Sequence, residues 1–147
     1  MIETERLVIR PLEEADRPAV LAAWLDPANE RAPGQPEDRV RKWAAGVPWG
    51  VFEKETDEYV GDCSLFFADE HGEWELAYGI NRDRWGRGYA TEAARACVRY
   101  GFEEMGLEKI VADLHDNPAS RRVLEKCGFA EVKPDYFELT PRPARGA

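Results

Sequence analysis

The spacing of apolar residues divides this chain into short strands and helices. An early strand is expected over residues 6–10, and Val20 and Trp24 have the i, i+4 spacing of a helix over 13–24. Further strands are expected at 49–53, 59–67, 73–80, 109–114, 129–133 and 136–140. Further helices are expected at 36–45, 91–105 and 118–127, with a loop rich in Pro and Gly over 26–36. Strands that first follow one another and then alternate with helices predict an α/β fold with a mixed sheet, antiparallel at first and with a parallel pair later.

The helix over 91–105 has the clearest amphipathic pattern. Its apolar stripe is expected to comprise Ala94, Cys97, Val98, Gly101, Phe102 and Met105. Arg95, Arg99 and Glu103 fall on the opposite side, which is expected to face water. This helix is therefore predicted to pack with one face on the sheet.

Length and composition favour a single folded domain over residues 1–147, with a loose tail at about 141–147. Hydrophobic residues make up 44% of the chain, no apolar run is long enough to span a membrane, and the N-terminus is too charged for a signal peptide. Three cysteines without metal or redox spacing suit a reducing compartment, so a cytoplasmic location is expected. Two histidines exclude a multi-histidine metal centre, and no metal is expected.

The net charge of −9 argues against general nucleic-acid binding, which needs a basic surface. The excess of acidic residues has two interpretations. It serves solubility, or carboxylates near a binding site attract a cationic amine. The acidic segment 69–73 is the place where such attraction is expected.

A glycine-rich turn between the strand at 73–80 and the helix at 91–105 predicts a phosphate site. Gly86 and Gly88 let the backbone approach a ligand, and the first N–H groups of the helix point at the same place. The turn is not a Rossmann fingerprint, because Thr91 stands where the third glycine belongs. No Walker A string is present either.

A second motif lies at residues 117–129, which read NPASRRVLEKCGF. Asn117 suits the N-cap of a helix, Pro118 suits its first position, and Gly128 suits the position that ends it. The segment therefore predicts a short helix with a defined beginning and end.

These two motifs and the opening segment together resemble the GNAT superfamily of N-acetyltransferases. Residues 85–96 (WGRGYATEAARA), 117–129 and 4–12 (TERLVIRPL) follow one another with the family's spacing, and the first is closest to ribosomal-protein-alanine N-acetyltransferases. Trp85 stands where the general family pattern has Gln or Arg.

The resemblance implies the GNAT fold, with acetyl-CoA as co-substrate. The strands at 73–80 and 109–114 would run parallel and splay apart, and the pantetheine arm would pair with the backbone between them. Cofactor-binding residues implied in this way are Tyr78, Gly79, Ile80, Trp85, Gly86, Arg87, Gly88, Tyr89, Ala90, Thr91, Asn117, Ser120 and Arg121. Arg122 is a further candidate for the adenosine 3′-phosphate.

The catalytic candidates are Glu75, Ser120 and Tyr78. Glu75 shares a strand face with Ala77 and Gly79, which leaves room for a water and an amine, and an acid from this strand is the base in several branches. An exposed glutamate without a catalytic role is the alternative, and Glu73 is the backup. By analogy the Tyr78 backbone N–H would bind the oxyanion.

Protonation of the leaving thiolate is assigned differently from the common family pattern. Many members place a Tyr seven residues after the Asn of the second motif, but this position is Leu124. Ser120 is the substitute that the ribosomal-protein branch suggests, and a capping or solvent role is its alternative.

The expected activity is acetyl transfer from acetyl-CoA to a primary amine, either a protein N-terminus or a small amine. A non-catalytic acetyl-CoA-binding module that regulates a partner is the alternative. Trp24, Trp43, Trp49, Tyr136 and Phe137 are candidate liners of the acceptor pocket, each with a core position as the alternative. Because the segment after Phe129 is short for the family, the expectation is either a more open site or a homodimer that completes the site.

Overall fold

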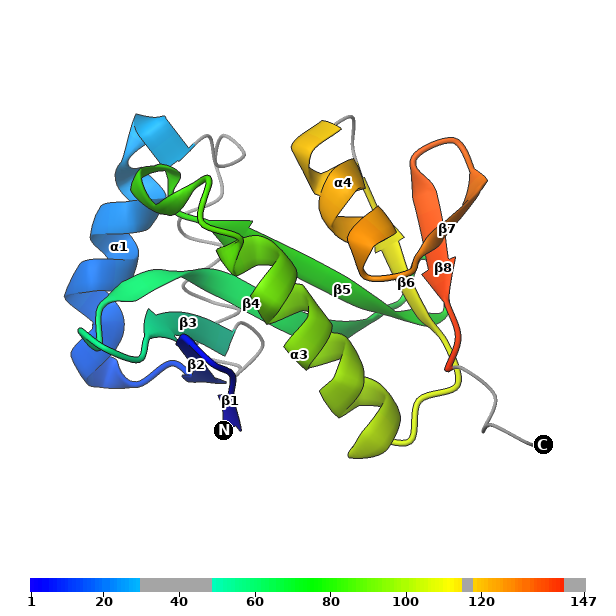
Figure 1. The fold of residues 1–147 in the computed structure, drawn as a ribbon, viewed down its shortest axis with the longest axis horizontal. Helices are drawn as coiled ribbons and strands as arrows, with labels where there is room; N and C mark the ends of the chain where they lie inside the picture. The colour runs from blue at the N-terminus through cyan, green and yellow to red at the C-terminus, as the bar shows by residue number, and fades with distance from the viewer. Residues whose placement is uncertain (30–48, 115–117, 142–147) are drawn as a thin grey trace.

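The structure, a computed structural model, describes residues 1–29, 49–114 and 118–141 (Figure 1). Within these ranges it contains one sheet of eight strands in the order β1-β2-β3-β4-β5-β6-β8-β7. The strands are β1 (Ile2–Glu3), β2 (Leu7–Pro11), β3 (Trp49–Glu53), β4 (Tyr59–Ala68), β5 (Glu73–Ile80), β6 (Ile110–Asp113), β7 (Ala130–Lys133) and β8 (Tyr136–Leu139). The predicted strands are all present, and β1 was missed because two residues show no period. The helix predicted at 36–45, Trp43 and Asn117 lie outside the described residues.

Three α-helices accompany the sheet in the part of the chain described. They are α1 (Arg17–Leu25), α3 (Tyr89–Glu103) and α4 (Pro118–Lys126). Three short 3-10 turns are η1 (Glu14–Asp16), η2 (Pro27–Asn29) and η3 (Arg82–Arg84). The helix predicted from residue 13 begins as η1, because the Asp16 carboxylate accepts the Glu13 N–H at 2.7 Å and holds a tighter first turn. None of the described helices is long and apolar enough to cross a membrane.

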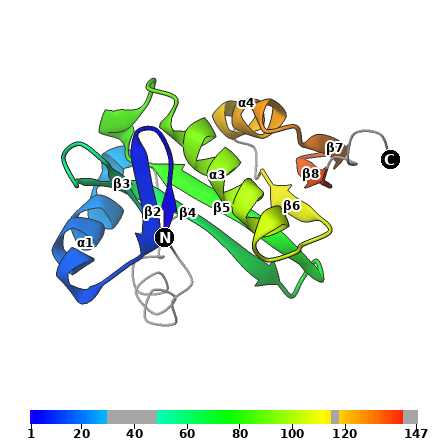
Figure 2. The ribbon, with the colours of Figure 1, turned by 60° about the horizontal axis from the view of Figure 1, so that its bottom comes forward.

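The helices α3 and α4 cover one face of the sheet (Figures 1 and 2). Ala94, Cys97, Val98 and Gly101 of α3 are buried there, as the apolar stripe predicted, and so is Ala93, which the stripe did not include. A Cβ on Gly101 would lie 2.9 Å from Leu65 Cδ1, so a side chain at this position would require Leu65 of β4 to shift. The placement of Met105 in the stripe was wrong. The helix ends at Glu103, and Met105 follows it with 37% exposure.

The helix α1 packs on the other face, around the buried residues Val20, Ala23 and Trp24. Trp24 Nε1 donates to Tyr59 Oη and to Asp62 Oδ2, both at 3.2 Å, and Asp62 is only 6% exposed. Trp24 is therefore a core residue that satisfies a buried carboxylate, and not a liner of an open pocket.

The sheet opens between β5 and β6, its parallel pair. Glu75 and Val111 are the pair in register between these two strands, whereas β4 and β5 stay paired from Ala68 and Glu73 to Gly61 and Ile80. Toward the carboxyl end of β5 the two strands therefore part. The mixed sheet with a splayed parallel pair confirms the predicted fold class.

Candidate active site

The glycine-rich turn leads directly into α3. Gly86 and Gly88 have φ angles of +80° and +79°, a left-handed conformation that favours glycine. A Cβ on Gly86 would meet no atom within 4 Å, so this glycine is required for the backbone conformation and not for room. Gly88 is the N-cap and offers no side-chain cap to the first turn of α3. The helix begins at Tyr89, two residues earlier than expected, and its N-terminus faces the turn as an anion site requires.

A half-buried carboxylate under the turn was not predicted. Glu53, at the end of β3, accepts a hydrogen bond from Tyr89 Oη at 2.6 Å and from Arg84 Nε at 3.2 Å, and Arg87 Nη1 lies 3.6 Å away. The Tyr89 hydroxyl, followed by Arg84, lowers the pKa of Glu53 below its ordinary value. Tyr89 is thus left with only its backbone for a ligand. No local pattern reveals this contact, because Glu53 and Tyr89 are 36 residues apart.

Trp85 closes the loop between β5 and α3. Its Nε1 donates to the Ile80 carbonyl at 2.7 Å, and the Arg82 guanidinium lies 4.2 Å from the centre of its ring. The indole therefore ties the glycine-rich turn to the end of β5. This contact gives a structural reason for a Trp at this position. The Ile80 carbonyl that accepts the hydrogen bond belongs to a predicted cofactor-binding residue.

The backbone of β5 presents alternate residues to its two neighbours. The Asn81 N–H donates to the Val60 carbonyl at 2.8 Å, and the register with β4 is continuous from Ile80 to Glu73. Because hydrogen bonding alternates along an antiparallel pair, Gly79 faces β4, whereas Tyr78 and Ile80 face the side of β6. The backbone of Tyr78 therefore lies along the opening, as the predicted oxyanion role needs.

The side chain of Tyr78 reaches toward α4. Its hydroxyl donates to the backbone carbonyl of Ser120 at 3.0 Å, and burial raises the pKa of Tyr78 above its ordinary value. Ser120 is the third residue of α4 and is half-buried. Leu124, at the position where many family members have Tyr, is 1% exposed and belongs to the core. Ser120 and Tyr78 are thus brought together on the α3/α4 side of the opening.

Arg121, a predicted cofactor-binding residue, is occupied within the protein. Its guanidinium donates to both carboxylate oxygens of Glu131 at 2.8 and 3.0 Å and to Asp135 at 3.0 Å. Such a bidentate pair holds the group in place. Arg122 is exposed, so it is the better placed of the two for a phosphate.

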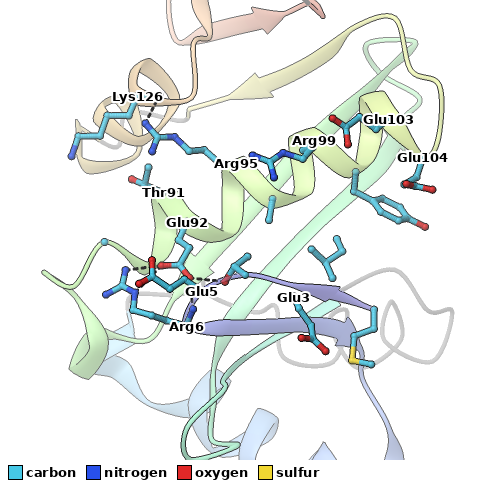
Figure 3. A pocket seen from close by; sticks show the side chains of 16 residues that line it. Glu3, Glu5, Arg6, Thr91, Glu92, Arg95, Arg99, Glu103, Glu104 and Lys126 are labelled. Atoms are coloured by element: carbon cyan, nitrogen blue, oxygen red, sulfur yellow. Dashed lines mark hydrogen bonds and ion pairs between the residues drawn. The ribbon is translucent and has the colours of Figure 1, made fainter.

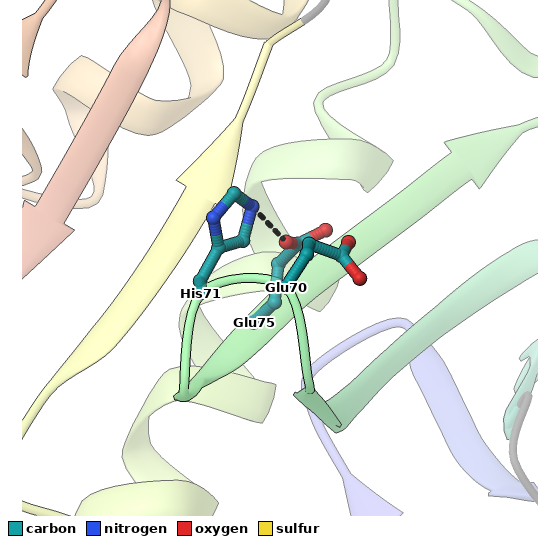
Figure 4. Close-up of side chains that lie close together, drawn as sticks. All are labelled: Glu70, His71 and Glu75. Atoms are coloured by element: carbon teal, nitrogen blue, oxygen red, sulfur yellow. Dashed lines mark ion pairs between the residues drawn. The ribbon is translucent and has the colours of Figure 1, made fainter.

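Glu75 lies on the face opposite to α3 and α4, at the point where β5 and β6 part. Its Oε1 is 3.4 Å from His71 Nε2 (Figure 4). The same nitrogen is 3.7 Å from Asp113 Oδ2 on β6. The ring of Tyr136 meets His71 edge-on with centroids 5.0 Å apart. His71 and Asp113 were not predicted, because only the pairing of β5 with β6 brings the three side chains together.

The contacts of the remaining candidates bear on two further predictions, the backup base and the aromatic liners of the acceptor pocket. Glu73, the backup base, lies 3.1 Å from Lys109 Nζ, which also contacts Glu138 at 3.3 Å. Trp49 packs edge-on against Tyr100 of α3, and Phe137 is 1% exposed in the same core. Of the aromatic candidates described, Tyr136 is the one beside Glu75.

A groove that does not include Glu75 lies along α3 and the N-terminal residues 1–6 (Figure 3). It has a volume of about 1080 Å³ and includes Gly88 and Thr91 at one end. Arg6 pairs with Glu92 at 2.7 Å, and Arg95 Nη2 donates to the Lys126 carbonyl at 3.0 Å. The groove is lined by side chains of both charges, and none of its lining residues belongs to β5 or β6. It is therefore distinct from the opening between these two strands.

The chain belongs to the GNAT acetyltransferase family. Residues 6–130 match the family described as Acetyltransferase (GNAT) domain. The Bacillus subtilis protein named uncharacterized N-acetyltransferase YoaA is 31% identical over 88% of this chain and 82% of its own length. The family and the enzyme class that the motifs indicated are thereby confirmed: the chain is an acetyltransferase.

Solved structures of acetyltransferases share the fold. A GNAT-family acetyltransferase from Bacillus anthracis superposes with a TM-score of 0.80 at 26% identity, over 95% of this chain and 97% of its own. A chimera of the Vibrio cholerae spermidine N-acetyltransferase SpeG gives a TM-score of 0.73 at 18% identity, over 92% and 96% of the two chains. The second likeness is one of fold alone.

Proposed function

We propose that this enzyme transfers the acetyl group of acetyl-CoA to a primary amine by direct attack in a ternary complex. The observation that supports this proposal most directly is the position of Glu75. It lies at the paired end of the opening between β5 and β6, on the face opposite to α3 and α4. A base on one face and a nucleotide site on the other let the amine and the thioester approach each other from opposite sides.

The cofactor side is supported by the turn and the helix that follows it. The backbone of residues 87–91 would hold the pyrophosphate at the N-terminus of α3, with Arg87, half exposed, adding a charged contact. Gly86 sets the turn, and the backbone of Tyr78 to Ile80 would pair with the pantetheine arm. Asn117 and Ser120 remain proposed contacts at the start of α4.

The chemistry follows from the properties of an amine and a thioester. An alkyl ammonium titrates near about 10 and a peptide N-terminus near about 8, so a proton must be removed before the nitrogen can attack. Glu75 accepts that proton, and the nitrogen forms a bond with the acetyl carbon. The Tyr78 N–H stabilises the oxyanion, the C–S bond breaks, and Ser120 donates a proton to the departing sulfur. The second proton, which the nitrogen loses as the amide forms, restores the Ser120 hydroxyl.

Calorimetric titration with acetyl-CoA, with CoA as comparison ligand, tests the cofactor site. Thiol release is then followed with N-terminal peptides and small polyamines as acceptors. Micromolar binding together with acceptor-dependent thiol release is the expected result. Binding without release for any amine would instead identify a non-catalytic acetyl-CoA-binding module, and absence of binding would overturn the cofactor site.

A further inference from the structure

The turn between β4 and β5 holds His71 directly over the candidate base. The Ala68 carbonyl accepts the N–H groups of His71 at 3.1 Å and of Gly72 at 2.8 Å. Gly72 has a φ of +66°, and a Cβ there would meet no atom within 4 Å. In this left-handed conformation Gly72 reverses the direction of the chain. The side chain of His71 therefore lies over Glu75, which follows it by four residues.

The imidazole is held from three strands. Tyr136 of β8 packs edge-on against the ring, Glu75 of β5 lies 3.4 Å from Nε2, and Asp113 of β6 lies 3.7 Å from it. Asp113 and Tyr136 face each other in the β6–β8 ladder. The pairing of β6 with β8 thus places one carboxylate and one ring around His71, and the pairing of β5 with β6 adds Glu75.

Both nitrogen–oxygen distances are slightly longer than a hydrogen bond. Contacts of this kind in the absence of substrate commonly tighten when the reacting complex forms. The side chain of His71 is 20% exposed and that of Glu75 is 12% exposed, so the imidazole is the more accessible of the two to solvent.

We propose that His71 is a positioning residue for Glu75, and that it also takes on the proton which Glu75 removes from the acceptor. This inference rests on the proposed function. The proton leaves the ammonium nitrogen for the Glu75 carboxylate and then moves to Nε2 of the neutral ring. The imidazolium releases a proton to water, and Glu75 is a carboxylate again for the next turnover. Asp113 stabilises the charged ring in between.

The main test removes the His71 imidazole by mutation and then supplies free imidazole in the buffer. His71→Gln is expected to lower kcat about 100-fold while the KM for acetyl-CoA stays unchanged, because only proton transfer is affected. His71→Ala is expected to behave alike and to regain rate when imidazole is added to the buffer. Added imidazole is expected to have no effect on the wild type or on Glu75→Gln. A kcat of His71→Gln within about twofold of wild type would overturn the proposal, as would a loss that imidazole does not relieve.

A spectroscopic measurement tests the contact without reference to turnover. The chain has two histidines, so His71→Gln assigns the imidazole nitrogen resonances of His71 by their loss. Glu75→Gln and Asp113→Asn are expected to shift them, whereas Glu103→Gln on the far side of the molecule serves as the control. Unshifted resonances in both variants would overturn the geometry. If the wild type shows no turnover with any amine, the proposed function fails, and this measurement still decides whether His71 contacts Glu75.

A bound metal is the competing explanation of the same cluster. Glu70, His71 and Glu75 each offer a ligand atom within 4.8 Å of the others. The proton-transfer role predicts that wild-type rate and imidazole rescue are both insensitive to a chelator. Loss of activity on chelation, with recovery on adding zinc, would make the cluster a metal site and overturn the proposal.

Discussion

On one face of β5, Leu76, Tyr78 and Ile80 pack against α3 and α4, whereas on the other face Glu75 meets His71 and Asp113. The first face is lined by buried apolar residues, and its polar contact is the Tyr78 hydroxyl on a backbone carbonyl. The second gathers carboxylates, an imidazole and a phenol ring. One strand, through its period of two, thus supplies packing on one side and chemistry on the other. Changes on the apolar face are therefore expected to act on stability, and changes on the charged face on rate.

A large effect on cofactor affinity is expected from the glycine-rich turn between β5 and α3. Gly88→Glu places a negative charge at the proposed pyrophosphate site, and the affinity for acetyl-CoA is expected to fall about 100-fold or more. Gly106→Glu is the matched control, because Gly106 also has a positive φ of +68° and open space around it. Both variants carry a similar backbone strain of about 1–2 kcal/mol. Equal calorimetric affinities for the two variants would contradict the cofactor site.

On the charged face, Glu75→Gln is expected to lower the rate about 100- to 10,000-fold at neutral pH. Binding of acetyl-CoA should be retained, because Glu75 faces away from α3. The deficit should shrink toward pH 10, where an alkylamine deprotonates itself. Glu73→Gln, two residues earlier and paired with Lys109, is the control. Pre-steady-state rates across this pH range test the assignment, and an undiminished rate for Glu75→Gln at pH 7 would refute it.

The apolar face is probed by Leu124→Ala. Leu124 is 1% exposed in the core beneath α4, and its truncation is expected to cost about 2–5 kcal/mol of unfolding free energy. Glu125→Ala, the exposed neighbour, should change stability by less than about 0.5 kcal/mol. Urea unfolding measures both. A loss at Leu124 no greater than at Glu125 would mean that α4 contributes little to the core.

The smallest effect is expected under the turn, at Glu53. Its pKa is lowered in the folded state, so its stabilising effect is present above the unfolded value of about 4.3 and is lost as pH falls through the folded value. Glu53→Gln should therefore cost about 1–3 kcal/mol at pH 7 and progressively less below pH 4. Glu55→Gln, an exposed change in the same hairpin, is the control. A cost that does not vary with pH would show that charge at Glu53 is unimportant.

Sequence patterns were sufficient for most of the fold and for part of the site. The strands other than β1 and the turn before α3 followed from local periods and from glycine chemistry, whereas the parallel run of β5 and β6 followed from the resemblance to the GNAT superfamily. Met105 was misplaced because a helical stripe does not reveal where the helix stops. Glu75 was found by alternation along its strand, but its neighbours His71, Asp113 and Tyr136 lie in a turn and in two other strands, and no local spacing connects them.

The sequence by itself therefore determined which residues face the same side of a strand or helix, and which glycine-rich turn leads into a helix N-terminus. These properties depend on backbone geometry over a few residues. The tertiary structure decided which partners meet: Glu53 under Tyr89, Arg121 held by Glu131, and Glu75 beside His71. Such contacts join segments distant in sequence, and they form only when strand order and register are fixed by the packing of the whole sheet.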